Sequence, residues 1–212
     1  MEEGESTAVR RRGRNRQAIL DAALELIDES GIDGWSMREL AGRVQYTAGA
    51  LYRYFDSKTA LLEALTTQAL QELRGRLGAC QSTHGPLGLL EELGLAYLDF
   101  ADARPALFRL GLLQMPSRRT SLGQDPGAES PYGVVLDAVR VAITAGEIST
   151  ADTFTDEHIA FTIWATVHGM AVLEHTHLSG FDADFTVIHR EALRRVLTGL
   201  SNRATHTNRS RR

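Results

Sequence analysis

Between residues 47 and 58 the sequence sets small side chains beside aromatic and basic ones. The small residues come first and leave room for another molecule to approach the backbone: Thr47, Ala48, Gly49 and Ala50. At the start of a helix the unpaired N–H groups attract phosphate, and a helix that enters the major groove sets side chains against base edges. Three long side chains that can bind phosphates or bases follow: Tyr52, Arg53 and Tyr54. This pattern indicates contact with nucleic acid.

Lys58 supports this interpretation, because it places a cation at the start of a helix, where the helix dipole disfavours positive charge. A bound phosphate would account for it. The alternative is that Tyr52 and Tyr54 only cover a small three-helix core. Further upstream, the arginines between Arg10 and Arg16 form a basic arm that is either simply solvated or reaches DNA.

Short helices are expected to position these side chains. A first helix carries one apolar stripe at helical spacing and ends at Gly31; the stripe is Ile19, Ala22, Ala23, Leu26 and Ile27. Ser36 and Glu39 have the spacing of a capping box, flanked by the apolar pair Trp35 and Leu40, so a second helix begins at Met37.

Thr47 can cap a third helix, in which Leu51 and Phe55 lie one turn apart and must face inward. Two short helices joined by a tight turn form a helix-turn-helix. A fourth helix is expected from Lys58 to about Leu77, and it links this small unit to the rest of the chain.

Two motifs in this region resemble the TetR family of repressors: Ser36-Met-Arg-Glu-Leu-Ala-Gly-Arg-Val44 and Ala50-Leu-Tyr-Arg-Tyr-Phe-Asp-Ser-Lys-Thr-Ala-Leu-Leu62. The resemblance spans about residues 19–65 and implies a homodimer whose recognition helices enter successive major grooves of a palindrome. It also implies that Arg38 and residues 47–50 contact bases or nearby phosphates, that Tyr52 contacts either, and that Tyr54 and Lys58 contact phosphates. Gln45 stands where the family usually has glycine, and a left-handed conformation there costs ~1 kcal/mol, so a slightly altered turn is expected.

The remaining sequence also shows helical periodicity and no strand pattern, so the fold class is all-α. Helices are expected at Pro86–Ala101, Pro105–Gln114, Tyr132–Ala145, Thr155–Leu178 and Asp184–Leu200, with a loop at Met115–Ser130. The predicted organisation is a flexible basic arm (1–15), a helix-turn-helix domain (16–62), a larger ligand-binding and dimerisation domain (63–200) and a flexible tail (201–212).

The C-terminal part resembles a subgroup of the family with a Trp-His-Gly signature, here Trp164, His168 and Gly169. Membership of the family implies that the last two helices pair with their copies in a dimer. A small-molecule pocket is expected among the helices, with His168 as its polar anchor; the candidate lining residues are Phe100, Phe108, Leu112, Trp164 and His168.

Composition narrows the function classes. The net charge of −4 argues against a protein that coats nucleic acid with its whole surface. The absence of a long apolar run and of a secretory signal argues against a membrane protein and for a cytoplasmic one, and the single Cys80 excludes a cysteine-based zinc site. No enzyme motif occurs, so neither enzymatic activity nor a cofactor is expected.

The function expected is a DNA-binding transcriptional regulator, a repressor that a small-molecule inducer releases from its operator. Two alternatives stay open. One is a helical ligand-binding or scaffold protein whose helix-turn-helix no longer reads DNA. The other is a metal-dependent enzyme, suggested by the histidines near Glu174. His168 and His175 are about 10.5 Å apart on a helix at ~1.5 Å per residue, which is too far for them to share an ion. Glu174 and His177, however, have the spacing of a chelating pair. No metal site is assigned.

Overall fold

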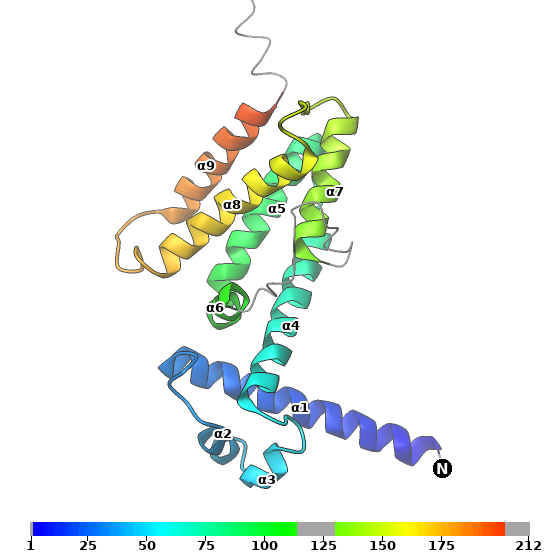
Figure 1. Ribbon diagram of the computed structural model, residues 1–212, viewed down its shortest axis with the longest axis vertical. Helices are drawn as coiled ribbons and strands as arrows, with labels where there is room; N and C mark the ends of the chain where they lie inside the picture. The colour runs from blue at the N-terminus through cyan, green and yellow to red at the C-terminus, as the bar shows by residue number, and fades with distance from the viewer. Residues whose placement is uncertain (1, 114–129, 202–212) are drawn as a thin grey trace, which may run out of the picture. The chain divides into compact units, whose positions relative to one another are not determined.

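The computed structural model describes residues 2–113 and 130–201, without the side chains of residues 2–8, 112 and 113. The described ranges consist of helices joined by turns and loops, and they hold no strand, only two isolated bridges (Figure 1). The helices are α1 (Glu2–Ser30), α2 (Met37–Arg43), α3 (Ala48–Leu51), α4 (Lys58–Gly78), α5 (Gly85–Ala103), α6 (Pro105–Leu113), α7 (Pro131–Thr144), α8 (Asp156–His175) and α9 (Phe185–Leu200). The expected all-α class is confirmed.

The chain divides into two compact units. The first unit contains α1, α2, α3, the part of α4 up to Ala69, and α6; the second contains the rest of α4 with α5, α7, α8 and α9. This division differs from the expected boundary at residue 62, because α6 packs on α1 although it follows α5 in sequence. Its Leu107 and Leu110 are buried, and Arg109 forms an ion pair with Asp28 of α1 at 2.9 Å.

In the first unit, α1 buries the predicted apolar stripe, with Ile19, Ala23 and Ile27 fully buried. Gly31 follows the helix with a φ of +79°. The helix begins at Glu2, so it includes the basic segment that the sequence suggested would form an arm before it. The arginines between Arg10 and Arg16 therefore lie at fixed helical spacing along α1.

Ser36 and Thr47 are the N-caps of the two short helices, as predicted, and of the expected capping box the structure shows the bond to the Ser36 side chain. The backbone N–H of Glu39 donates to Ser36 Oγ at 3.2 Å, and that of Ala50 donates to Thr47 Oγ1 at 3.2 Å. Leu40 and Leu51 are completely buried beneath them. Gln45 joins the helices with a φ of +58°, and it is the one non-glycine residue with positive φ in the described chain. The turn therefore forms without glycine.

In the second unit, α5 packs against α7, α8 and α9, and α8 also packs against α7 and α9 (Figure 1). Helix α8 is shorter than the expected Thr155–Leu178, because the backbone of Thr176 leaves the helical region with φ −125° and ψ −82°. The expected loop at Met115–Ser130 and the expected tail at 201–212 lie outside the described residues, apart from Ser130 and Ser201. No described helix is both long and apolar enough to cross a membrane.

Candidate functional sites

The start of α3 presents its small residues to solvent. Thr47, Ala48 and Gly49 are exposed and Ala50 is half-buried. A Cβ atom added at Gly49 would meet no other atom within 4 Å, so the space above the helix is open. The geometry allows a large molecule to approach this turn closely.

The long side chains on and after α3 fall into two groups. Tyr52 and Arg53 are exposed, as is Arg38 on α2. Tyr54 is half-buried: its hydroxyl accepts a hydrogen bond from Asn15 at 3.2 Å, and its ring stacks on Tyr46 at 6.1 Å between centroids. Tyr54 is thus partly committed to holding α3 against its neighbours, while the other three side chains extend into solvent.

Helix α1 contributes directly to the same surface. Arg12 donates to the backbone carbonyl of Arg53 at 3.5 Å, and the Arg16 guanidinium lies over the Phe55 ring at 4.8 Å from its centroid. These contacts place the basic stretch of α1 beside α3. Positive charge is therefore gathered on this surface although the chain as a whole is acidic.

Lys58 has an internal role that its position in the sequence did not suggest. Its ammonium group donates to the backbone carbonyl of Trp35 at 2.8 Å and lies 4.2 Å from the centroid of the Trp35 ring. The cation at the start of α4 is thus explained within the fold, without a phosphate. An ammonium group has three N–H donors, so contact with DNA is also chemically open to it.

A second cation is fully engaged in holding α2 to α1. The Arg43 guanidinium donates to both carboxylate oxygens of Glu29, at 2.7 and 2.6 Å. This hydrogen bonding lowers the pKa of Glu29 below its ordinary value. Arg43 therefore belongs to the scaffold of the helix-turn-helix.

The candidate effector site in the second unit centres on an aromatic cluster. His168 and Trp164 of α8 meet Tyr97 of α5: the Tyr97 hydroxyl and His168 Nδ1 are 2.6 Å apart, and the Tyr97 and Trp164 rings pack edge to face at 5.0 Å. Tyr132 adds a second edge contact to Trp164 at 5.8 Å. Burial raises the pKa of Tyr97 and lowers that of His168, so both groups are neutral near pH 7.

Next to this cluster lies a small apolar cavity of about 10 Å³. Its lining includes Leu77 at the end of α4, Gly94 and Tyr97 of α5, Val135 of α7 and Trp164 of α8. A cavity of this size holds at most about one water molecule. A ligand larger than a water molecule would fit here only if the surrounding helices moved apart.

The other predicted lining residues do not join this cluster. Phe100 is 2% exposed in the core, with the Arg76 guanidinium 5.6 Å from the ring centroid. Phe108 lies in α6, which belongs to the first unit, and the side chain of Leu112 lies outside the described residues. Tyr97 was not among the residues predicted from the sequence. A tyrosine on an apolar helical stripe could have indicated it, because a buried hydroxyl needs a hydrogen-bond partner.

Two family models match this chain, one at each of its two parts. Residues 19–65 match the family model described as bacterial regulatory proteins, tetR family. Residues 90–200, just over half of the chain, match the model described as tetracyclin repressor-like, C-terminal domain.

Two curated relatives and one solved structure are similar. An uncharacterised helix-turn-helix transcriptional regulator of Bacillus subtilis is 24% identical over 89% of this chain and 93% of its own length. The class D tetracycline repressor protein of Escherichia coli is 45% identical over 56 residues, which is 26% of each protein. A Rhodococcus protein of unknown function has a TM-score of 0.73 at 25% identity, covering 89% of this chain and 96% of that protein.

Proposed function

The chain belongs to the TetR family of bacterial regulatory proteins, and we propose that it is a repressor that binds a palindromic operator as a homodimer and is released by a small molecule. Members of the family are DNA-binding transcriptional regulators, and this chain is one of them. The proposal adds the direction of regulation, the residues that contact DNA, the dimer interface and the effector site. We expect it to act in the cytoplasm.

The observation that carries the proposal is the open surface of α3. Small exposed residues at its first turn let the backbone approach a groove, and Arg38, Tyr52 and Arg53 stand around that turn with their side chains in solvent. The arginines of α1 beside α3 suit the phosphates that flank the groove. The left-handed Gln45 keeps the turn closed, which argues against a helix-turn-helix that no longer reads DNA.

Selection from random duplexes tests DNA binding. We expect an enriched palindrome, and we expect Arg38→Ala and Tyr52→Ala to weaken binding to it by about 1–3 kcal/mol each if they contact bases. Arg74→Ala is the matched control, because Arg74 is an exposed arginine of α4 that belongs to the second unit and lies outside α8 and α9. The absence of any enriched sequence would contradict the proposal.

The dimer interface is proposed to lie on α8 and α9. Large apolar side chains are exposed there: Phe161 (47%), Leu173 (49%), Val187 (61%) and Ile188 (49%). Large exposed apolar side chains are typical of interaction surfaces, and two antiparallel helices with their copies form a four-helix contact.

Sedimentation velocity tests this interface. The double change Val187→Asp and Ile188→Asp should convert the dimer to a monomer and weaken operator binding. The control is Val141→Asp on α7, since Val141 is 53% exposed but lies outside this face. A dimer that survives the double change would place the interface elsewhere.

The effector is proposed to enter between Tyr97 and Trp164, enlarging the apolar cavity. A compound that fits would be largely apolar and aromatic, with one polar group that hydrogen-bonds to Tyr97 or His168. Leu77 lines this cavity and stands at the end of α4, whose first residue holds Trp35 of the helix-turn-helix. Displacement of Leu77 would thus move α4 and change the spacing of the two recognition helices from the roughly 34–36 Å of one DNA turn.

This mechanism is tested by screening compounds for stabilisation of the protein and then measuring operator affinity. An effector should weaken operator binding, and Trp164→Ala should abolish its effect while leaving DNA binding intact. A compound that binds tightly at Trp164 but leaves operator affinity unchanged would contradict the mechanism.

A further inference from the structure

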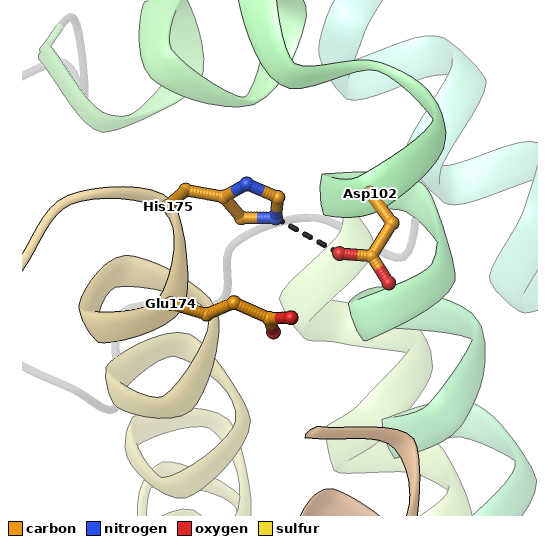
Figure 2. Close-up of side chains that lie close together, drawn as sticks. All are labelled: Asp102, Glu174 and His175. Carbon is orange, nitrogen blue, oxygen red and sulfur yellow. Dashed lines mark hydrogen bonds and ion pairs between the residues drawn. The ribbon is translucent and has the colours of Figure 1, made fainter. Parts of the chain in front are cut away.

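Two helices of the second unit bring three metal-ligating side chains together. Figure 2 shows Glu174 and His175 at the end of α8 pointing toward Asp102 in the last turn of α5. His175 Nε2 lies 3.0 Å from Asp102 Oδ1, and one ligand atom of each residue lies within 4.8 Å of the others. Such separations are close to those of ligands that share one ion, since metal–nitrogen and metal–oxygen bonds are about 2.0–2.2 Å long.

A buried histidine orients one of these groups. His189 of α9 is 6% exposed, and its Nε2 lies 3.3 Å from Glu174 Oε2. This contact restrains the direction of that carboxylate. Polar neighbours that orient the ligands in this way are typical of metal sites.

The carboxylates have no stronger cationic partner. Within the described part of the chain, no lysine or arginine forms an ion pair with Asp102 or Glu174; their ionic partners are His175 and His189. Two carboxylates in one cluster concentrate negative charge at this place. A divalent cation would balance it.

We propose that Asp102, Glu174 and His175 bind a divalent transition-metal ion of the zinc class. One imidazole and two carboxylates suit such ions, whereas calcium and magnesium prefer oxygen ligands alone. Three protein ligands leave at least one coordination position open for water or for a small anionic molecule. This ligand set differs from the Glu174–His177 pair suggested by sequence spacing, because α8 ends at His175.

Metal binding would tie the last turn of α5 to the end of α8. Asp102 stands two residues before Arg104, and α6, the next helix, belongs to the first unit. The ion would therefore restrain the second unit beside the point where the chain leaves it. This proposal does not depend on which effector or operator the protein binds.

Isothermal titration of chelator-treated full-length protein with ZnCl₂ tests the site. We expect one tight equivalent of zinc per chain. Asp102→Asn, Glu174→Gln and His175→Gln should each weaken zinc binding at least 10-fold, and His189→Gln should weaken it by about 10- to 100-fold through the orientation of Glu174. His177→Gln and His84→Gln are the near and distant histidine controls and should bind zinc as the wild type does.

The alternative is that Asp102 and His175 form only an ion pair. No stoichiometric zinc binding by the wild-type protein, or equal binding by the Asp102, Glu174 and His175 variants, would overturn the proposal. If the variants fail to fold, anomalous scattering from zinc-soaked wild-type crystals decides: a peak between Asp102 and His175 supports the site, and no peak there rejects it.

Discussion

The internal role of Lys58 can be tested by replacing it with methionine, which keeps an unbranched side chain but removes the charge. The change deletes a charged hydrogen bond to the Trp35 carbonyl, worth about 1.5–3 kcal/mol, and a cation–π contact, worth about 0.5–1 kcal/mol. Removing a cation from the start of α4 also removes an unfavourable interaction with the helix dipole, which stabilises the protein by roughly 0.3–1 kcal/mol. Since Lys58 is half-buried and partly screened by water, we expect the free energy of unfolding of the first unit to fall by about 1–3 kcal/mol.

The assay uses the placement of the two tryptophans, Trp35 in the first unit and Trp164 in the second. In a Trp164→Phe background, fluorescence during urea unfolding reports on the first unit alone. Arg53→Met is the matched control, because Arg53 is an exposed cation on the same unit and its loss should leave the unfolding midpoint unchanged. An unchanged midpoint for Lys58→Met would refute the assigned role.

The same variant separates stability from DNA contact. A side chain that also binds phosphate contributes about 0.9 to the slope of log affinity against log salt concentration. If Lys58 contacts DNA, the slope of the Lys58→Met variant should decrease by about that amount per subunit. If Lys58 only holds Trp35, the slope should stay the same while the protein becomes less stable.

Three further predictions concern the glycines, the turn and pH. Gly94→Ala should destabilise the second unit by about 1–3 kcal/mol, because its Cβ would overlap Leu193 and press on Val167. Gly75→Ala, on the open face of α4, should instead stabilise the protein by roughly 0.5–1 kcal/mol. Thermal unfolding of the two variants compares these effects. Gln45→Gly should raise stability by up to about 1 kcal/mol by relieving the left-handed backbone, and Gln45→Ala should not, as urea titration would reveal. Burial lowers the pKa of His168, so below the ordinary value of 6.5 the unfolded chain binds more protons than the folded one. The free energy of unfolding of the wild-type protein should therefore fall as the pH drops below 6.5. The fall should be smaller in His168→Gln, which has no imidazole at this position.

Local features of the fold could be predicted from the sequence because they depend on residues a few positions apart. The caps at Ser36 and Thr47 and the inward pair Leu51 and Phe55 follow from short-range spacing, and the structure forms each of them. The expectation about Gln45 came instead from the resemblance to the family, and its backbone is left-handed. The DNA-facing side chains stay a prediction, although Arg38, Tyr52 and Arg53 are exposed as that role requires.

Contacts between distant segments could not be predicted in this way. The Lys58 bond spans 23 residues, the Tyr97 to His168 bond 71, and the Asp102 to His175 pair 73. Periodicity indicates which side of a helix is buried but not which helix covers it. The placement of α6 was missed for the same reason, since its apolar residues are compatible with either unit.

The position of α6 has a consequence for how the protein is made. Helix α6 packs on α1, its Leu107 and Leu110 are buried, and Arg109 pairs with Asp28 across 81 positions. A nascent chain that has emerged only as far as α4 therefore lacks one wall of its first unit and exposes apolar surface. The folding of the first unit can be completed only after α5 has been synthesised and α6 has followed it out of the ribosome. A fragment cut after Ala69 should for the same reason be aggregation-prone, so we expect that the helix-turn-helix cannot be transferred to another protein without α6.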